Sequence, residues 1–161
     1  MVKVKDKVAL GTIAGILSNV IVTIIDIVFY KLDVIKFLHF HIAASVYFPI
    51  SEVHTLPALI VGAIADFTLA AYLGVIIVYT LFYTGTDYSY VKGLGIVFAF
   101  WLFIYGIIER LNIARIDPTD PGTNLVHLAI HIILGLLTSW IIVKHGIPLN
   151  KNKLIDQENN V

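Results

Sequence analysis

The chain has 161 residues, of which 58% are hydrophobic and only 14% are charged, whereas soluble domains carry roughly 45–50% apolar and about 25% charged residues. A water-soluble fold of this size could not hide so much apolar surface. The 11 basic and 11 acidic side chains cancel, so nothing points to nucleic acid, and with no cysteine the chain has no disulfide, thiolate metal site or thiol nucleophile. We therefore expect an all-α integral membrane protein whose first partner is the lipid bilayer.

Four apolar segments reach the ~20 residues that a helix needs to cross the hydrocarbon. In chain order they are residues 8–30, 57–82, 91–109 and 123–143. Helices are expected because backbone N–H and C=O groups inside lipid must be paired within their own segment. The predicted fold is a four-helix bundle in a single transmembrane domain, residues 1–145, followed by a polar tail, residues 146–161.

The segment between the first two spans is too apolar for an ordinary loop, although it contains charged residues and histidines. Such a mixture is typical of a helix that lies in the membrane interface. We predict an additional interfacial or re-entrant helix over residues 32–48, with a fifth crossing of the membrane as the alternative. His39 and His41 would be two positions apart on that helix, where side chains do not face each other, so they are predicted to form an interfacial polar edge.

The basic residues predict the orientation, because cytoplasmic flanks carry more lysine and arginine. With four spans, one side holds seven lysines: Lys3, Lys5, Lys7, Lys92, Lys144, Lys151 and Lys153. The other side holds four basic residues: Lys31, Lys36, Arg110 and Arg115. Both termini are therefore predicted to be cytoplasmic.

Gly11 and Gly15 stand four residues apart in the first span, and Ser18 continues the same face. Small residues at this spacing let two helix backbones approach closely in lipid. We predict that this face packs inside the chain's own bundle. A contact with a second copy or with a partner membrane subunit is the alternative.

Five ionisable residues lie within the predicted spans: Asp26, Asp66, Glu109, His127 and His131. Each costs roughly 2.5–3.5 kcal/mol at the centre of a membrane helix, so such residues are seldom accidental. At about 1.5 Å per residue, Asp66 and His131 both lie roughly 12–14 Å inside the outer boundary, and the other three lie closer to the outer surface. We predict a connected acid–histidine cluster in the outer half of the bundle, with Asp66 and His131 as its central pair.

The predicted cluster has three interpretations. Its members can be structural hydrogen-bond partners that fix helix register. All five can form a proton or ion path, because histidine exchanges protons near neutral pH. His127, His131 and Asp66 can bind a divalent metal, either zinc, iron or manganese, because imidazole and carboxylate suit these ions.

The sequence carries no motif of a known reaction. The glutamate of a zinc-protease helix is missing between His127 and His131, and no catalytic serine elbow, phosphate loop or dinucleotide fingerprint is found. The predicted function is a non-enzymatic structural or accessory subunit, or a small membrane protein that handles ions or metals. The alternative is a membrane-embedded, metal-dependent enzyme that uses the same residues.

Three short stretches, residues 11–15, 117–124 and 127–135, are similar to small uncharacterised membrane proteins of clostridia and related spore-forming bacteria. The layout of four spans, an early GxxxG and a histidine before a glycine in the last span also resembles the YqhR-like membrane proteins. The resemblance covers most of the chain in layout, but only these stretches in residues. It implies a bacterial inner-membrane location and carries no established activity.

Overall fold

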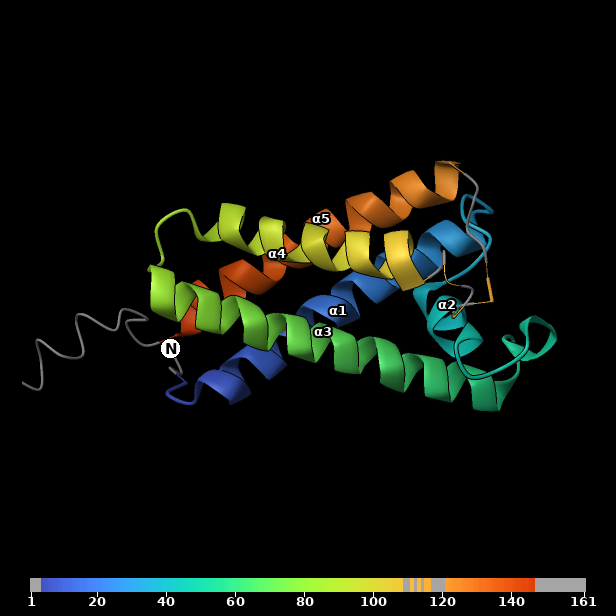
Figure 1. Cartoon of the computed structure of the whole chain (residues 1–161), viewed down its shortest axis with the longest axis horizontal. Coiled ribbons are helices and arrows are strands. Elements are labelled where there is room, and N and C mark those ends of the chain that lie inside the picture. Colours follow the sequence, from blue (N-terminus) through green and yellow to red (C-terminus); the bar gives the residue numbers. More distant parts are fainter. Residues whose placement is uncertain (1–3, 109–110, 112, 114, 117–120, 147–161) are drawn as a thin grey trace, which may run out of the picture.

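The computed structural model describes residues 4–108, 111, 113, 115–116 and 121–146, and these residues form helices without any extended strand (Figure 1). The α-helices are α1 (Lys7–Lys31), α2 (His39–Ser45), α3 (Leu56–Thr84), α4 (Ser89–Phe103) and α5 (Pro121–His145). A 3₁₀ turn, η1 (Ile50–Glu52), precedes α3, and a π-helical turn, η2 (Ile104–Ile108), continues α4. This confirms the predicted all-α class.

Three helices, α1, α3 and α5, are long and apolar enough to cross a membrane. Each begins and ends within two residues of a predicted span. Helix α4 is apolar but has only 15 residues before the chain passes into η2. The apolar runs of the sequence therefore become the long helices, because a helix pairs every backbone polar group within the run.

Local sequence sets the ends of these helices. The Asp6 carboxylate accepts a hydrogen bond from the Ala9 N–H at 3.0 Å and thereby caps the start of α1. Helix α3 ends at Gly85, whose φ of 84° is easily reached only without a side chain. Lys92 then donates from Nζ to the carbonyl oxygens of Thr84 and Gly85, at 3.0 and 2.8 Å. The conformation of Gly85 and the Lys92 hydrogen bonds thus stabilise the turn between α3 and α4.

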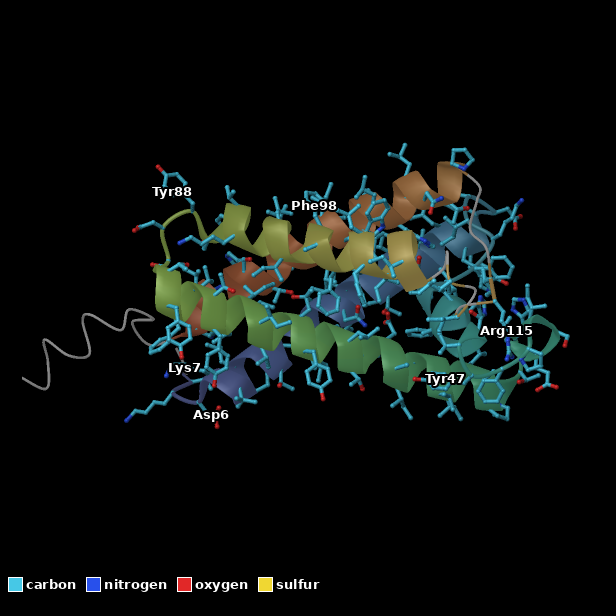
Figure 2. All side chains as sticks on the ribbon, viewed as in Figure 1. Asp6, Lys7, Tyr47, Tyr88, Phe98 and Arg115 are labelled. Atoms are coloured by element: carbon cyan, nitrogen blue, oxygen red, sulfur yellow. The ribbon has the colours of Figure 1, made fainter. Side chains whose placement is uncertain are left out.

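The start of α1, the end of α3 and the end of α5 lie at one end of the molecule (Figure 1). The Val4 N–H donates to the His145 carbonyl oxygen at 3.1 Å, and Lys7 Nζ lies 4.0 Å from the centroid of the Phe82 ring. We call this the terminal end. The opposite end, the α2 end, holds α2 and the loops on both sides of it, and Figure 2 shows Tyr47 and Arg115 there.

Helices α1 and α3 touch through small residues. A Cβ added to Gly15 would meet the carbonyl oxygen of Ala70, and one added to Gly74 would meet that of Gly11. The predicted face of Gly11 and Gly15 therefore packs inside the chain's own bundle, as expected. Around this contact lies the main core, which α1, α3, α4 and α5 share.

The segment between α1 and α3 differs from the prediction of a helix over residues 32–48, because only His39–Ser45 is α-helical. Asp33 adopts a left-handed backbone (φ 56°), and Leu38 is extended (φ −73°, ψ 157°), so the chain is not helical between Leu32 and His39. Helix α2 packs against α3, and a Cβ on Gly62 would meet the carbonyl oxygen of Phe40. As a result, His39 begins a helix that is held against the bundle.

Candidate functional site

Three helices bring one ionisable side chain each to a common point at the α2 end. They are Asp26 of α1, His39 of α2 and His127 of α5, and one ligand atom from each lies within 4.8 Å of the other two. Asp26 is 3% exposed and His127 is fully buried. We call these three residues the Asp–His–His group.

Asp26 holds the first residue of α2 by two contacts. The backbone N–H of His39 donates to Asp26 Oδ2 at 2.9 Å, and Nδ1 of the same histidine lies 3.0 Å from the same oxygen. An ionised carboxylate can only accept, so in this contact Nδ1 carries the hydrogen. The carboxylate therefore fixes both the start of α2 and the orientation of the His39 ring.

Helix α5 places two histidines beside this contact. His127 Nε2 lies 3.7 Å from Asp26 Oδ1, which is too long for a hydrogen bond. The ring centroid of His39 is 4.2 Å from that of His127 and 5.2 Å from that of His131. His131 Nδ1 lies 2.7 Å from the His127 carbonyl oxygen, so Nδ1 carries a hydrogen that it donates within α5.

The pKa of His39 reflects two opposing influences. Burial disfavours its charged form and lowers the pKa, whereas the charge of Asp26 and the hydrogen bond to it raise the pKa, as does the charge of Asp66. The net direction is upward from the ordinary value. His39 and Asp26 therefore form a buried ion pair, in which each group compensates the desolvation of the other.

The Asp–His–His group has the chemistry of a transition-metal site. Imidazole nitrogen and carboxylate oxygen suit zinc, iron and manganese, and around a tetrahedral zinc with bonds of about 2.0–2.1 Å the ligand atoms lie roughly 3.4 Å apart. One ligand atom from each of the three residues lies within 4.8 Å of the others, so the side chains would have to draw closer around an ion, and the hydrogen that His39 Nδ1 donates to Asp26 would leave if that nitrogen bound the ion. Three protein ligands would leave a coordination position open.

Asp66 of α3 lies outside this group and is held by a residue of α1. Asn19 Nδ2 donates to Asp66 Oδ2 at 2.6 Å. Both side chains line a cavity of about 280 Å³, together with His39 and His131. The rest of the lining is mainly aliphatic and aromatic and comes from all five α-helices, from η2, and from Val46, Tyr47 and Ile113 outside them.

The structure thus distributes the predicted site residues over two neighbouring places. Asp26 and His127 belong to the Asp–His–His group, whereas Asp66 and His131 line the cavity. Of the predicted metal ligands His127, His131 and Asp66, only His127 lies in the group that could hold an ion. Glu109 lies outside the described residues.

His39 is the member of the site that sequence reasoning missed. It was assigned to an interfacial polar edge, but it lies between Asp26, His127 and the cavity. The available signal was its strongly apolar neighbourhood in the sequence, because a polar ring among residues that pack on the bundle needs a buried partner.

The second histidine of α2 has a different environment. His41 is 3% exposed, its Nδ1 accepts the Leu38 N–H at 3.1 Å, and its ring lies 4.4 Å from that of His54. Burial lowers the pKa of His41 to about 4, and the neighbouring His54 adds to this effect. His41 is therefore neutral near pH 7, which the accepted hydrogen bond requires, and it serves the start of α2.

Comparison of the chain with protein-family models, with curated proteins and with solved structures finds no match.

Proposed function

We propose that the chain is an integral membrane protein that binds a divalent transition-metal ion, either zinc, iron or manganese, at Asp26, His39 and His127. The convergence of these three side chains from three different helices carries the proposal. Ionisable side chains are costly inside a membrane protein and usually mark a functional site or a partner. Here they supply two imidazoles and one carboxylate, a donor set that suits these metals.

The proposed protein crosses the membrane four times. Three helices have the length of a span, and α4 with its direct continuation η2 reaches the ~20 residues required. The start of α5 lies at the α2 end, opposite the turn between α3 and α4 (Figure 1). The chain must therefore travel the length of the molecule between Ser89 and Pro121.

Metal content measured by mass spectrometry on detergent-purified protein tests the proposal. We expect about one ion per chain after loading with zinc, manganese or ferrous iron followed by desalting. Asp26→Asn and His127→Gln should each weaken binding at least about tenfold, because the loss even of a supporting residue has an effect of this size. His145→Gln, at the terminal end, is the matched control and should bind as the wild type does.

No metal above the blank, or equal metal in wild type and both variants, would contradict the proposal. The Asp–His–His group would then be a structural polar contact that ties α1, α2 and α5 together. In that case Asp26→Asn and His127→Gln should lower the thermal midpoint without changing the metal content.

A membrane-embedded metal enzyme is a second candidate, favoured by the cavity that His39 lines beside the group. The two candidates differ in how firmly the metal is held. A resident catalytic ion should remain through dialysis against metal-free buffer, whereas an ion that the protein handles should exchange with an added isotope of the same metal.

A further inference from the structure

The cavity beside the Asp–His–His group combines an apolar wall with a small polar patch. Aliphatic and aromatic side chains from several helices form most of its lining, and Asn19, His39, Asp66 and His131 form the polar patch. Pockets of this composition, mainly apolar with a few convergent polar groups, are typical small-molecule sites. The volume of about 280 Å³ lies near the lower limit of roughly 300 Å³ for such pockets, which indicates a small ligand.

The polar patch needs a ligand that both donates and accepts hydrogen bonds. His39 Nδ1 is committed to Asp26, and His39 Nε2 is buried with no hydrogen-bond partner among the described residues. Asp66 receives the Asn19 amide through Oδ2, so this carboxyl group is anchored on the same wall. A purely apolar occupant would leave a buried polar atom unpaired, which costs about 1–3 kcal/mol.

A hydroxyl group meets this requirement. It donates one hydrogen and accepts through two lone pairs. Where His39 Nε2 carries a hydrogen, the hydroxyl oxygen can accept it and donate its own hydrogen to the Asp66 carboxylate; where Nε2 carries none, the hydroxyl can donate to Nε2 and accept from a protonated Asp66. An ammonium group can only donate, and a carboxylate can only accept. Among these groups the hydroxyl is the one that can accept a hydrogen bond from one of these two side chains and donate one to the other.

The mouth of the cavity indicates where the ligand comes from. Tyr47, Leu69 and Ile113 line the cavity and are also exposed, at 62%, 41% and 46%. Of these three residues, Leu69 lies on α3, a helix of membrane-spanning length, and an exposed apolar side chain on such a helix faces lipid. A ligand that enters past such a rim arrives dissolved in the bilayer.

We propose that this cavity binds a small lipid-soluble alcohol, taken up from the membrane past Tyr47, Leu69 and Ile113, with its hydroxyl group between His39 and Asp66. This ligand site is separate from the proposed metal site, although both include His39. The apolar body of the alcohol would lie against the core residues Leu73, Ile130 and Leu134.

Photo-labelling in lipid nanodiscs tests the proposal. A medium-chain alkanol with a diazirine in its chain is photolysed with chelator-treated protein, so that no metal is needed, and the labelled residues are mapped by mass spectrometry. We expect labels on cavity-lining residues. At equal concentration in the bilayer, 1-octanol should compete about tenfold better than octane or octylamine, the ratio expected from one or two hydrogen bonds.

Two variants and a control make the test specific. Asp66→Leu should abolish the preference for octanol, and Ala43→Phe should reduce labelling by filling the cavity from α2. Thr68→Leu is the control. This exposed residue lies two positions after Asp66 on α3, and its hydroxyl donates within the same helix, to the Ile64 carbonyl oxygen. It should label as the wild type does.

Equal competition by octane, or labels confined to residues outside the cavity, would overturn the proposal. If Asp66→Leu does not fold, the wild-type competition and Ala43→Phe still decide the matter. Metal content of Asp66→Leu should equal that of the wild type, since Asp66 is not in the Asp–His–His group. Failure of the alcohol site and failure of the metal site are therefore read from different measurements.

Discussion

Asp26 is a carboxylate within a helix of membrane-spanning length, and it is almost completely buried. A charge in that position is tolerated only when other groups compensate it. The His39 ring, the backbone N–H at the start of α2 and the nearby His127 ring provide this compensation. One acidic residue of α1 thereby fixes the positions of two other elements.

The Asn19–Asp66 hydrogen bond supports a prediction at the same scale. Asn19→Leu should lower the free energy of unfolding by roughly 1–3 kcal/mol, because it removes the donor to a partly buried acid. Denaturant titration in detergent, followed by circular dichroism, measures this loss. In a double-mutant cycle, Asn19→Leu should cost much less when Asp66 is already leucine; additive losses would show that the two side chains do not interact.

Some residues of the site could be predicted from the sequence, but their partners could not. Asp26 and His127 could be singled out because each is an ionisable residue in an apolar run, and the cost of burial makes such residues conspicuous. The hydrogen-bond partner of Asp66 could not be predicted from the sequence, because hydropathy does not determine how α1 and α3 are rotated relative to each other. The structure gives Asp66 to Asn19, a residue on the same helix as Asp26.

At the scale of elements, α1 and α3 meet through close backbone contact at small residues, and larger apolar side chains pack around this contact. Gly11, Gly15 and Gly74 let the two backbones meet, since added Cβ atoms would contact backbone atoms of the other helix. In lipid such contacts stabilise helix pairs through packing alone, because the acyl chains are as apolar as the helices. The small-residue pattern made this contact predictable.

Gly15→Ala and Gly95→Ala form a matched pair that tests this contact. Both changes add one methyl group and the same gain in helix propensity, about 1 kcal/mol. At Gly15 the methyl group would meet the Ala70 carbonyl, whereas at Gly95 nothing lies within 4 Å. We expect Gly15→Ala to be less stable than Gly95→Ala by about 1–3 kcal/mol, the usual cost of overpacking, as measured by thermal unfolding in detergent.

A dimer contact would give a different result. Gly15→Ala would then leave the unfolding of the isolated chain close to that of Gly95→Ala and would instead shift the sedimentation profile from dimer to monomer. That outcome would contradict the assignment of this glycine face to the α1–α3 contact.

The long helices and the segment before α3 differ in how predictable they were. In lipid, a run of about 20 apolar residues can pair all its backbone polar groups within the run only as a helix, so the long helices could be predicted from hydropathy. Between Leu32 and Phe48 the apolar character was compatible with several backbone conformations. The left-handed Asp33 and the extended Leu38 shorten the helix to seven residues, and this changed start is why the direction of the His39 side chain did not follow from helical periodicity.

For the molecule as a whole, both proposed sites lie at one end, and the other end carries a small excess of basic residues. The Asp–His–His group and the cavity with its exposed rim involve α2. Among the described residues, the terminal end holds four basic residues, Lys5, Lys7, Lys92 and Lys144, and the α2 end holds three, Lys31, Lys36 and Arg115 (Figure 1). Because cytoplasmic flanks are richer in basic residues, the terminal end should face the cytoplasm. The two proposed sites would then be closer to the outer face of the membrane.

This topology predicts the labelling of introduced cysteines, and the chain suits the experiment because it contains no cysteine of its own. Lys5→Cys and Asp87→Cys are at exposed positions of the terminal end, and Ser51→Cys is at an exposed position near the α2 end. In sealed, right-side-out vesicles a membrane-impermeant maleimide should react with the cysteine at position 51 only, and in inverted vesicles with the other two.

Reaction of positions 5 and 87 from opposite faces would contradict the shared terminal end, in which Val4 bonds to His145 and Lys7 lies over Phe82. Reaction of both from the outside would leave the fold intact and reverse its orientation, which would place the Asp–His–His group nearer the cytoplasm.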